Sequence, residues 1–319
     1  MAEKPKLTYD SYLKITPLLE CQEPISEAHD EHLFIIVHQA FELWFKQVLH
    51  DVDSVRMLFY DKDWDNIRLH KAINRLQRVV LVLKLVVEHF HILETMPPLN
   101  FVDFRDELTG GSEFQSLQFR KIEKLLGIKD DKREKYEDQD YQDKMDPNDK
   151  EILLKYPNKD AADGRTLRGV VEIWLASTPG IDDSKFWGKY RQNKEELDPL
   201  LDESKYKTGS WQMSQRSLQG ALLIMLHQDK PEFQMPYQII TLLMDIDVAL
   251  MKWRSTHIHM VHRMIGQKQG TGGTKGTSGY DYLRATYNDN YKVFRDLFNM
   301  ATYLRPREEI PKMTDPTGC

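Results

Sequence analysis

Two of the eleven histidines stand at positions where an apolar helix would turn them inward. His38 follows Phe34 by four residues and precedes Phe45 by seven, so the three side chains share one helical face. His257 continues a seven-residue spacing that also includes Leu243, Leu250 and Met264. Inward histidines on two helices can bracket a planar cofactor, one as an axial ligand and the other as a distal polar group. For either histidine alone, a hydrogen-bonded core residue is the commoner situation, so the spacing leaves both interpretations open.

The neighbours of His257 suggest a competing zinc site. His257, His259 and His262 are close in sequence, but positions 257 and 259 point to nearly opposite sides of a helix. Only His259 and His262 share a face, and the His-Glu-x-x-His pattern of helical zinc sites does not occur. We therefore expect His259 and His262 to be solvated surface residues.

An arginine beside aromatic residues could hold a substrate carboxylate. Arg105 follows Phe101 and Phe104 in the segment 99–105. A guanidinium group binds a carboxylate through two parallel hydrogen bonds, while the rings can pack against an apolar body. The alternative is a surface arginine paired with Asp103 or Asp106, and the residue pattern alone makes this the commoner case.

The segment 270–279 is a glycine-rich loop that reads Gly-Thr-Gly-Gly-Thr-Lys-Gly-Thr-Ser-Gly. It lacks the spacing of a Walker loop, and Lys275 stands where a dinucleotide-binding loop needs its third glycine. The backbone N–H groups and hydroxyls of such a run can wrap a carboxylate or another anion. A lid that follows the helix of His257 and a plain flexible linker both remain open.

Long helices must position these residues. Apolar residues recur at helical spacing in four segments, at about 30–58, 64–96, 237–265 and 280–304. Pro97 and Pro98 break the second segment, Pro236 fits the first turn of the third, and Gly266 ends it. Because strand-like alternation is scarce, we predict an all-α fold, a bundle of long helices with smaller peripheral helices around a pocket.

The composition is that of a globular protein with one large core. The 319 residues are 40% hydrophobic and 29% charged. Charged residues crowd the stretch 128–165, which we expect to be an exposed connector within a single helical domain at 26–319. The net charge of −6 argues against a general nucleic-acid binder.

The cysteine content and the hydropathy of the sequence indicate the cellular compartment in which we expect the protein. The two cysteines, Cys21 and Cys319, lie nearly a chain length apart and imply no disulfide framework, which suits the cytoplasm. The apolar run 79–87 is interrupted by Lys84 and falls far short of the roughly 20 residues that a membrane span needs. No apolar signal core is found at the N-terminus, so we expect neither secretion nor a membrane anchor.

A longer pattern resembles a known family. The run 29–47, His-Asp-Glu-His-Leu-Phe-Ile-Ile-Val-His-Gln-Ala-Phe-Glu-Leu-Trp-Phe-Lys-Gln, looks like the signature of the tryptophan 2,3-dioxygenases. The segments 114–120, 244–254 and 270–273 resemble the same family in the same order. The similarity extends from about Leu7 to Lys312, and a signature of this length with three concordant blocks is far more specific than any single motif above.

The resemblance implies a cofactor and a reaction. The cofactor would be haem b, ferrous in the active state and held without covalent attachment, since no Cys-x-x-Cys-His motif occurs. The reaction would convert L-tryptophan and O2 to N-formyl-L-kynurenine, the first step of the kynurenine pathway. By position, His257 matches the proximal iron ligand, Trp253 a residue on the proximal side, and Ser112 a serine near the haem edge. His38 matches the distal histidine near the indole N–H, with a catalytic role in orienting the substrate.

The resemblance also implies substrate contacts and an assembly. Arg105 matches the residue that binds the substrate carboxylate, and Thr271 the one that contacts its amino-acid end. Phe34 and Phe101 match residues that line the indole pocket. The family forms homotetramers, and Tyr9 and Tyr12 resemble tyrosines of an N-terminal arm, here residues 1–25, that enters a neighbouring subunit.

Two departures and two rival functions accompany the resemblance. The glycine loop is about two residues longer than the common animal form, and the charged connector is shorter, which leaves the closure of the loop and any accessory ligand site there unspecified. A haem-based oxygen sensor or carrier would need His257 but not Arg105 or Thr271. A helical scaffold without a cofactor would need none of them.

Overall fold

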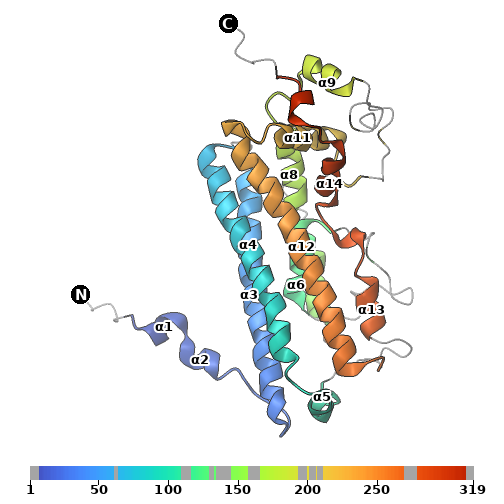
Figure 1. The fold of residues 1–319 in the computed structure, drawn as a ribbon. Coiled ribbons are helices and arrows are strands. Elements are labelled where there is room, and N and C mark those ends of the chain that lie inside the picture. Colours follow the sequence, from blue (N-terminus) through green and yellow to red (C-terminus); the bar gives the residue numbers. More distant parts are fainter. Residues whose placement is uncertain are drawn as a thin grey trace, which may run out of the picture.

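The computed structural model describes residues 7–60, 64–108, 116–128, 133, 145–156, 166–192, 200, 206, 211–268 and 279–313. Every regular element in these ranges is helical, which confirms the predicted all-α fold. Three long helices form the bundle: α3 (His29–Tyr60), α4 (Asn66–Leu93) and α12 (Pro231–Ile265). Helix α4 packs along both α3 and α12, so it is the central element of the bundle (Figure 1).

The smaller helices surround this bundle. They are α5 (Pro98–Arg105), α6 (Leu117–Leu126), α7 (Pro147–Leu154), α8 (Leu167–Leu175), α9 (Ser184–Arg191), α11 (Gln215–Leu226), α13 (Gly279–Ala285) and α14 (Arg295–Asn299). Helices α6 and α8 pack on α3, α13 packs on α12, and α5 contacts both α3 and α12 at one end of the bundle (Figure 1). Of the expected connector at 128–165, the structure describes residue 128, residue 133 and a segment around α7.

The sequence of α4 explains why this helix is central. The Asp65 side chain caps its first turn by accepting the backbone N–H of Arg68 at 2.7 Å. Apolar side chains then recur at helical spacing and are all buried: Leu69, Ala72, Ile73, Leu76, Val79, Val80, Leu83, Val86, Val87 and Phe90. This apolar face is wider than one stripe, because the helix packs against neighbours on two sides.

Helix α12 begins earlier than the residue pattern predicts. Pro231 occupies the first turn, and Pro236, which we expected there, lies inside the helix. A proline in this position removes the backbone hydrogen bond that an N–H would donate one turn back, and its ring crowds the carbonyl group there. The buried residues Phe233 and Pro236 hold the extra residues of the helix against the core.

The prediction of one long helix at 280–304 is wrong. The segment consists of α13, the 3-10 turn Asp289–Tyr291, α14 and the 3-10 turn Met300–Tyr303. The buried Asp247 carboxylate of α12 accepts the backbone N–H groups of Val293 and Phe294 at 2.9 and 2.6 Å. These N–H groups are therefore taken by a side chain of another helix, and the segment cannot continue as a helix through them. Burial raises the pKa of Asp247 to about 7, although the two N–H groups lower it.

The N-terminal segment stands apart from the bundle. Helices α1 (Tyr9–Leu13) and α2 (Ile15–Leu19) contain no buried residue, and they project away from the other helices (Figure 1). Tyr9 is 76% exposed and Tyr12 69%. Within the described ranges, no helix combines the length and the apolar character needed to cross a bilayer.

Candidate functional site

A cavity lies between α3 and α12. Its lining comes from five helices: α3 with His38, Phe41, Glu42 and Phe45, α4 with Phe90 and Leu93, α6 with Phe119 and Arg120, α12 with Trp253, Arg254, His257, Ile258 and Met260, and α13 with Tyr282 and Leu283. The cavity holds about 810 Å³ of space outside the protein atoms, part of it open to solvent. Most of the lining is apolar, as in most ligand pockets.

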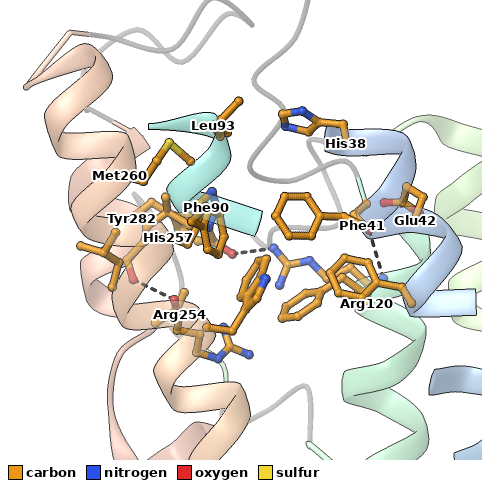
Figure 2. A pocket seen from close by; sticks show the side chains of 17 residues that line it. His38, Phe41, Glu42, Phe90, Leu93, Arg120, Arg254, His257, Met260 and Tyr282 are labelled. Carbon is orange, nitrogen blue, oxygen red and sulfur yellow. Dashed lines mark hydrogen bonds between the residues drawn. The ribbon is translucent and has the colours of Figure 1, made fainter. Parts of the chain in front are cut away.

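His257 projects into this cavity from α12 (Figure 2). Its ring stacks on Phe90 of α4, with centroids 5.5 Å apart, and lies 5.0 Å from the ring of Trp253. Burial lowers the pKa of His257 to about 3, and the positive charges of Arg254 and Arg120 act in the same direction. The imidazole is therefore neutral at physiological pH, which is the form that ligates a metal.

Trp253 closes the same side of the cavity. Its indole stacks on Phe119 of α6, with ring centroids 4.4 Å apart, and it contacts Phe45 and Phe90. The Trp253 Nε1 atom is buried and has no hydrogen-bond partner among the described residues. A buried donor left unpaired costs about 1–3 kcal/mol, so a bound group that offers an acceptor would stabilise this wall. Flat aromatic walls, a neutral histidine and an unpaired donor together fit a planar cofactor such as haem.

His38 reaches the cavity from α3, on the opposite side (Figure 2). Its Nδ1 atom lies 2.7 Å from the backbone oxygen of Phe34. Because a carbonyl oxygen only accepts, Nδ1 carries the proton. Burial lowers the pKa of His38 more than the Phe34 hydrogen bond and the negative charge of Glu42 raise it. The ring is therefore neutral, and its Nε2 atom is an acceptor suited to an N–H donor.

An aromatic cluster joins α5 to the His38 end of the cavity. The ring of Phe34 lies 4.0 Å from His38, 5.6 Å from Phe101 and 5.5 Å from Phe104. Arg105 ends α5, and its side chain is 13% exposed. Its Nη1 atom is 3.7 Å from the Asp106 carboxylate, beyond hydrogen-bond distance. Phe34 and Phe101 thus lie beside the cavity on the side of His38, and Arg105 ends the helix that carries Phe101.

A buried cluster of charged side chains adjoins the cavity. Glu123 of α6 is fully buried, and its carboxylate accepts from Arg120 at 3.0 Å, from Arg133 at 2.6 Å and from Arg254 of α12. Burial would raise the pKa of Glu123, but the three guanidinium groups lower it well below its usual range. Arg120 also donates to the Tyr282 hydroxyl of α13 at 3.4 Å (Figure 2). One carboxylate therefore ties α6 to α12 through arginines that line the cavity.

The other histidines of α12 face away from the cavity. His259 is exposed, and its Nδ1 contacts the backbone oxygen of Ser255 at 2.7 Å. His262 is also exposed and stacks on Tyr280, with centroids 4.1 Å apart. The prediction that His259 and His262 are surface residues is confirmed. Across the described ranges, no three His, Cys, Asp or Glu side chains converge into a metal-binding group.

The structure brings together only part of the predicted site. His38, His257 and Trp253 share one cavity, with Phe34 and Phe101 next to it, and Arg105 lies outside its lining at the end of α5. Tyr9 and Tyr12 do not line the cavity of their own chain. Ser112 and Thr271 lie outside the described residues, as does the glycine-rich loop.

Sequence reasoning gave no role to Glu42, Arg120, Glu123 or Arg254. Three of these four fall within the segments that carry the family resemblance, and Glu123 follows Arg120 by three residues, one turn along the same helix. An acidic residue one turn from an arginine is a common surface pattern, so the spacing did not distinguish this buried cluster from a solvated pair.

Comparisons with known proteins give a consistent result. The family model described as tryptophan 2,3-dioxygenase matches residues 1–207 and 191–304. The tryptophan 2,3-dioxygenase of Mus musculus is 43% identical, with 98% of this chain and 86% of the relative covered. The corresponding proteins of Rattus norvegicus and Xenopus tropicalis are 42% and 41% identical over the same shares.

The Glu123 cluster generates a stability prediction. Glu123→Gln removes a buried negative charge that pairs with three buried guanidinium groups, and it should lower the free energy of unfolding by about 3 kcal/mol or more at pH 7. Because folding lowers the pKa of Glu123, its contribution is fully present above the ordinary value of 4.5 and declines below it. The difference between the two proteins should therefore shrink as the pH falls from 7 towards 3. Denaturant unfolding followed by circular dichroism measures both effects.

Glu151→Gln is the matched control for this prediction. Glu151 pairs with Lys155 at 2.6 Å on the exposed face of α7, where water screens the interaction. This variant should unfold almost as the unaltered protein does. Equal stability of the Glu123→Gln and Glu151→Gln variants at pH 7 would show that the buried cluster does not support the cavity.

Proposed function

The chain belongs to the tryptophan 2,3-dioxygenase family, and from this premise we propose that it converts L-tryptophan and O2 to N-formyl-L-kynurenine with haem b as cofactor. The observation that carries the proposal is the cavity between two neutral histidines from α3 and α12. Both oxygen atoms of O2 end in the product, so the overall reaction consumes no external reductant. The scarcity of cysteine suits the cytoplasm, where we propose that it acts.

We assign the cofactor to the aromatic side of the cavity. His257 would hold the iron from α12, since its ring is neutral and directed into the cavity. Trp253 and Phe90 would pack against the cofactor, and the unpaired Trp253 Nε1 supports a bound acceptor on this side. When bound, ferrous haem supplies the dioxygen chemistry that amino-acid side chains lack. Ser112, which is outside the described residues, is proposed to lie near its edge.

The substrate would occupy the His38 side. The indole would pack against Phe34 and Phe101, whose rings stack 5.6 Å apart beside the cavity. Its N–H would donate to Nε2 of His38, the acceptor left by the bond between Nδ1 and Phe34. We regard His38 as an orienting group and not as an obligatory base, because an indole N–H is a very weak acid.

The amino-acid end of tryptophan requires a cation. Arg105 ends α5, the helix whose Phe101 and Phe104 contact Phe34, and we propose that it binds the carboxylate with two hydrogen bonds. Thr271 is proposed to contact the same end from the glycine-rich loop. Holding both ends of the substrate directs the C2–C3 bond of the indole towards the cofactor, and such positioning can supply several kcal/mol of barrier reduction.

We further propose a homotetramer in which the N-terminal arm, residues 1–25, reaches a neighbouring subunit. The exposed apolar residues of this arm support the proposal, since Leu7, Tyr9, Tyr12 and Leu19 are each at least 69% exposed. Large apolar side chains left exposed on and beside two helices that contain no buried residue indicate a protein partner. A second copy of the chain offers the indole pocket, beside which Tyr9 and Tyr12 would lie.

The substrate assignment predicts the behaviour of Arg105 variants. Reduced, haem-loaded protein should form N-formylkynurenine from L-tryptophan in air. Arg105→Ala should keep its haem and raise the tryptophan KM about tenfold to a hundredfold, the loss expected for a charged hydrogen-bond pair. The KM of Arg105→Lys should lie between those of the unaltered protein and Arg105→Ala. Arg216 is an exposed arginine paired with Asp182, and the control variant Arg216→Ala should leave the KM unchanged. An unaltered KM in Arg105→Ala would remove the carboxylate assignment.

Arm exchange predicts complementation between two defective chains. The double variant Tyr9→Ala/Tyr12→Ala lacks the arm contacts, and Arg105→Ala lacks the carboxylate contact. In a mixed assembly, the intact arm of the Arg105→Ala chain would complete the intact pocket of the other chain. Co-refolded mixtures should therefore turn over tryptophan faster than either variant alone. If arms stay within their own subunits, no pocket is complete and the mixture should be no faster.

A further inference from the structure

One side-chain hydrogen bond joins the first turns of α3 and α5. The Asn100 Nδ2 atom of α5 donates to the Asp30 Oδ2 atom of α3 at 2.8 Å. The two residues are 70 positions apart in sequence, and the Asp30 side chain is only 17% exposed. The bond therefore connects two helices across a partly buried contact.

Most of the contacts that the described residues make with α5 are apolar. The helix is eight residues long, and Phe104 is its only fully buried residue. Pro97 precedes it and makes no side-chain capping hydrogen bond. The contacts of Phe101 and Phe104 with Phe34 are apolar, and such packing holds the helix without fixing its register. The bond between Asp30 and Asn100 adds a directional contact between α5 and α3.

Both partners of this bond lie next to the substrate side of the cavity. Asn100 directly precedes Phe101 and shares its short helix with Arg105. Asp30 lies four residues before Phe34 and eight before His38, on the same face of α3. A displacement of α5 would therefore move the indole wall and the carboxylate ligand together, relative to His38. Displacements near 1 Å are large for a site that depends on orientation.

We propose that Asp30 and Asn100 are positioning residues for tryptophan binding, which act by fixing α5 and thereby Phe101 and Arg105. The inference rests on the proposed function, in which these two residues contact the substrate. Neither Asp30 nor Asn100 lines the cavity itself, so neither is expected to touch the substrate or the cofactor.

The adjacent acidic residue has a different task. Glu31 is buried and accepts the backbone N–H groups of Ile25 and Ser26 at 2.9 and 2.8 Å, and the Ser26 hydroxyl. It therefore holds the chain that leads from the arm into α3. Asp30 is the residue of this turn that contacts α5. Its carboxylate also lies 3.0 Å from Nδ1 of His29, whose ring is fully exposed.

A double-mutant cycle tests the proposal. Asp30→Ala and Asn100→Ala should each raise the tryptophan KM about threefold to tenfold, with kcat reduced less than twofold and haem content unchanged. This is less than for a direct substrate contact, because the bond acts only through the position of α5. The double variant should raise the KM no further than either single variant, because both remove the same bond. Asp30→Asn keeps an acceptor for the Asn100 amide and should lie closer to the unaltered protein.

Amide hydrogen exchange gives a readout that does not depend on turnover. The single variants should speed the exchange of amides in α5 and leave those of α4 unchanged. Asn74→Ala is the control, since the Asn74 amide bonds to His70 within α4, and it should change neither the KM nor α5 exchange. Unchanged α5 exchange, an unchanged KM in the single variants, or multiplicative effects in the double variant would each overturn the proposal. If the unaltered protein forms no N-formylkynurenine, the proposed function is wrong. Amide exchange in α5 then still reports whether the bond between Asp30 and Asn100 holds the helix.

Discussion

The separation of α3 from α12 by α4 is the constraint on which the site depends. Both outer helices pack along α4, so their inward residues face each other across a space that no side chain of α4 fills completely. Phe90 and Leu93 of α4 form the back of that space, and His38 and His257 reach it from the two sides (Figure 2). The two histidines are therefore held apart by helix packing and not by contact with each other. A planar group between them needs this kind of gap, which a bundle with α3 packed directly on α12 would not leave.

Desolvation then sets the chemistry of the cavity. Burial lowers the pKa of both His38 and His257, so each ring is neutral and can act through a lone pair. Burying charged arginine side chains in the apolar wall of this cavity would cost free energy of folding if no negative charge lay beside them. Glu123 provides that charge for Arg120 and Arg254 and ties α6 to α12 at the same point. The ion cluster and the apolar lining are therefore compatible, because the carboxylate allows cations to lie beside a mostly apolar pocket.

The residue pattern predicted those parts of the structure that depend on one helix at a time. Helical spacing placed His38 and His257 on inward faces and placed His259 outward, because burial of an amphipathic helix follows its own periodicity. It did not predict the break between α13 and α14, since that break depends on the Asp247 carboxylate of another helix. It also gave no position for Arg105 relative to His38, because a short helix with one fully buried residue takes its place from tertiary contacts. The identity of the substrate came from the long signature and not from periodicity.

The most direct measurement is a haem titration of the apoprotein, followed by the Soret band, in the unaltered chain and in two single-histidine variants of α12. His259→Ala removes an exposed histidine two residues from His257 on the same helix and serves as the matched control. The unaltered protein and His259→Ala should bind one haem per chain with the same spectrum, and His257→Ala should lose that spectrum and most of the affinity. Equal binding and an identical spectrum in the His257→Ala variant would contradict the assignment of the cavity as the haem site.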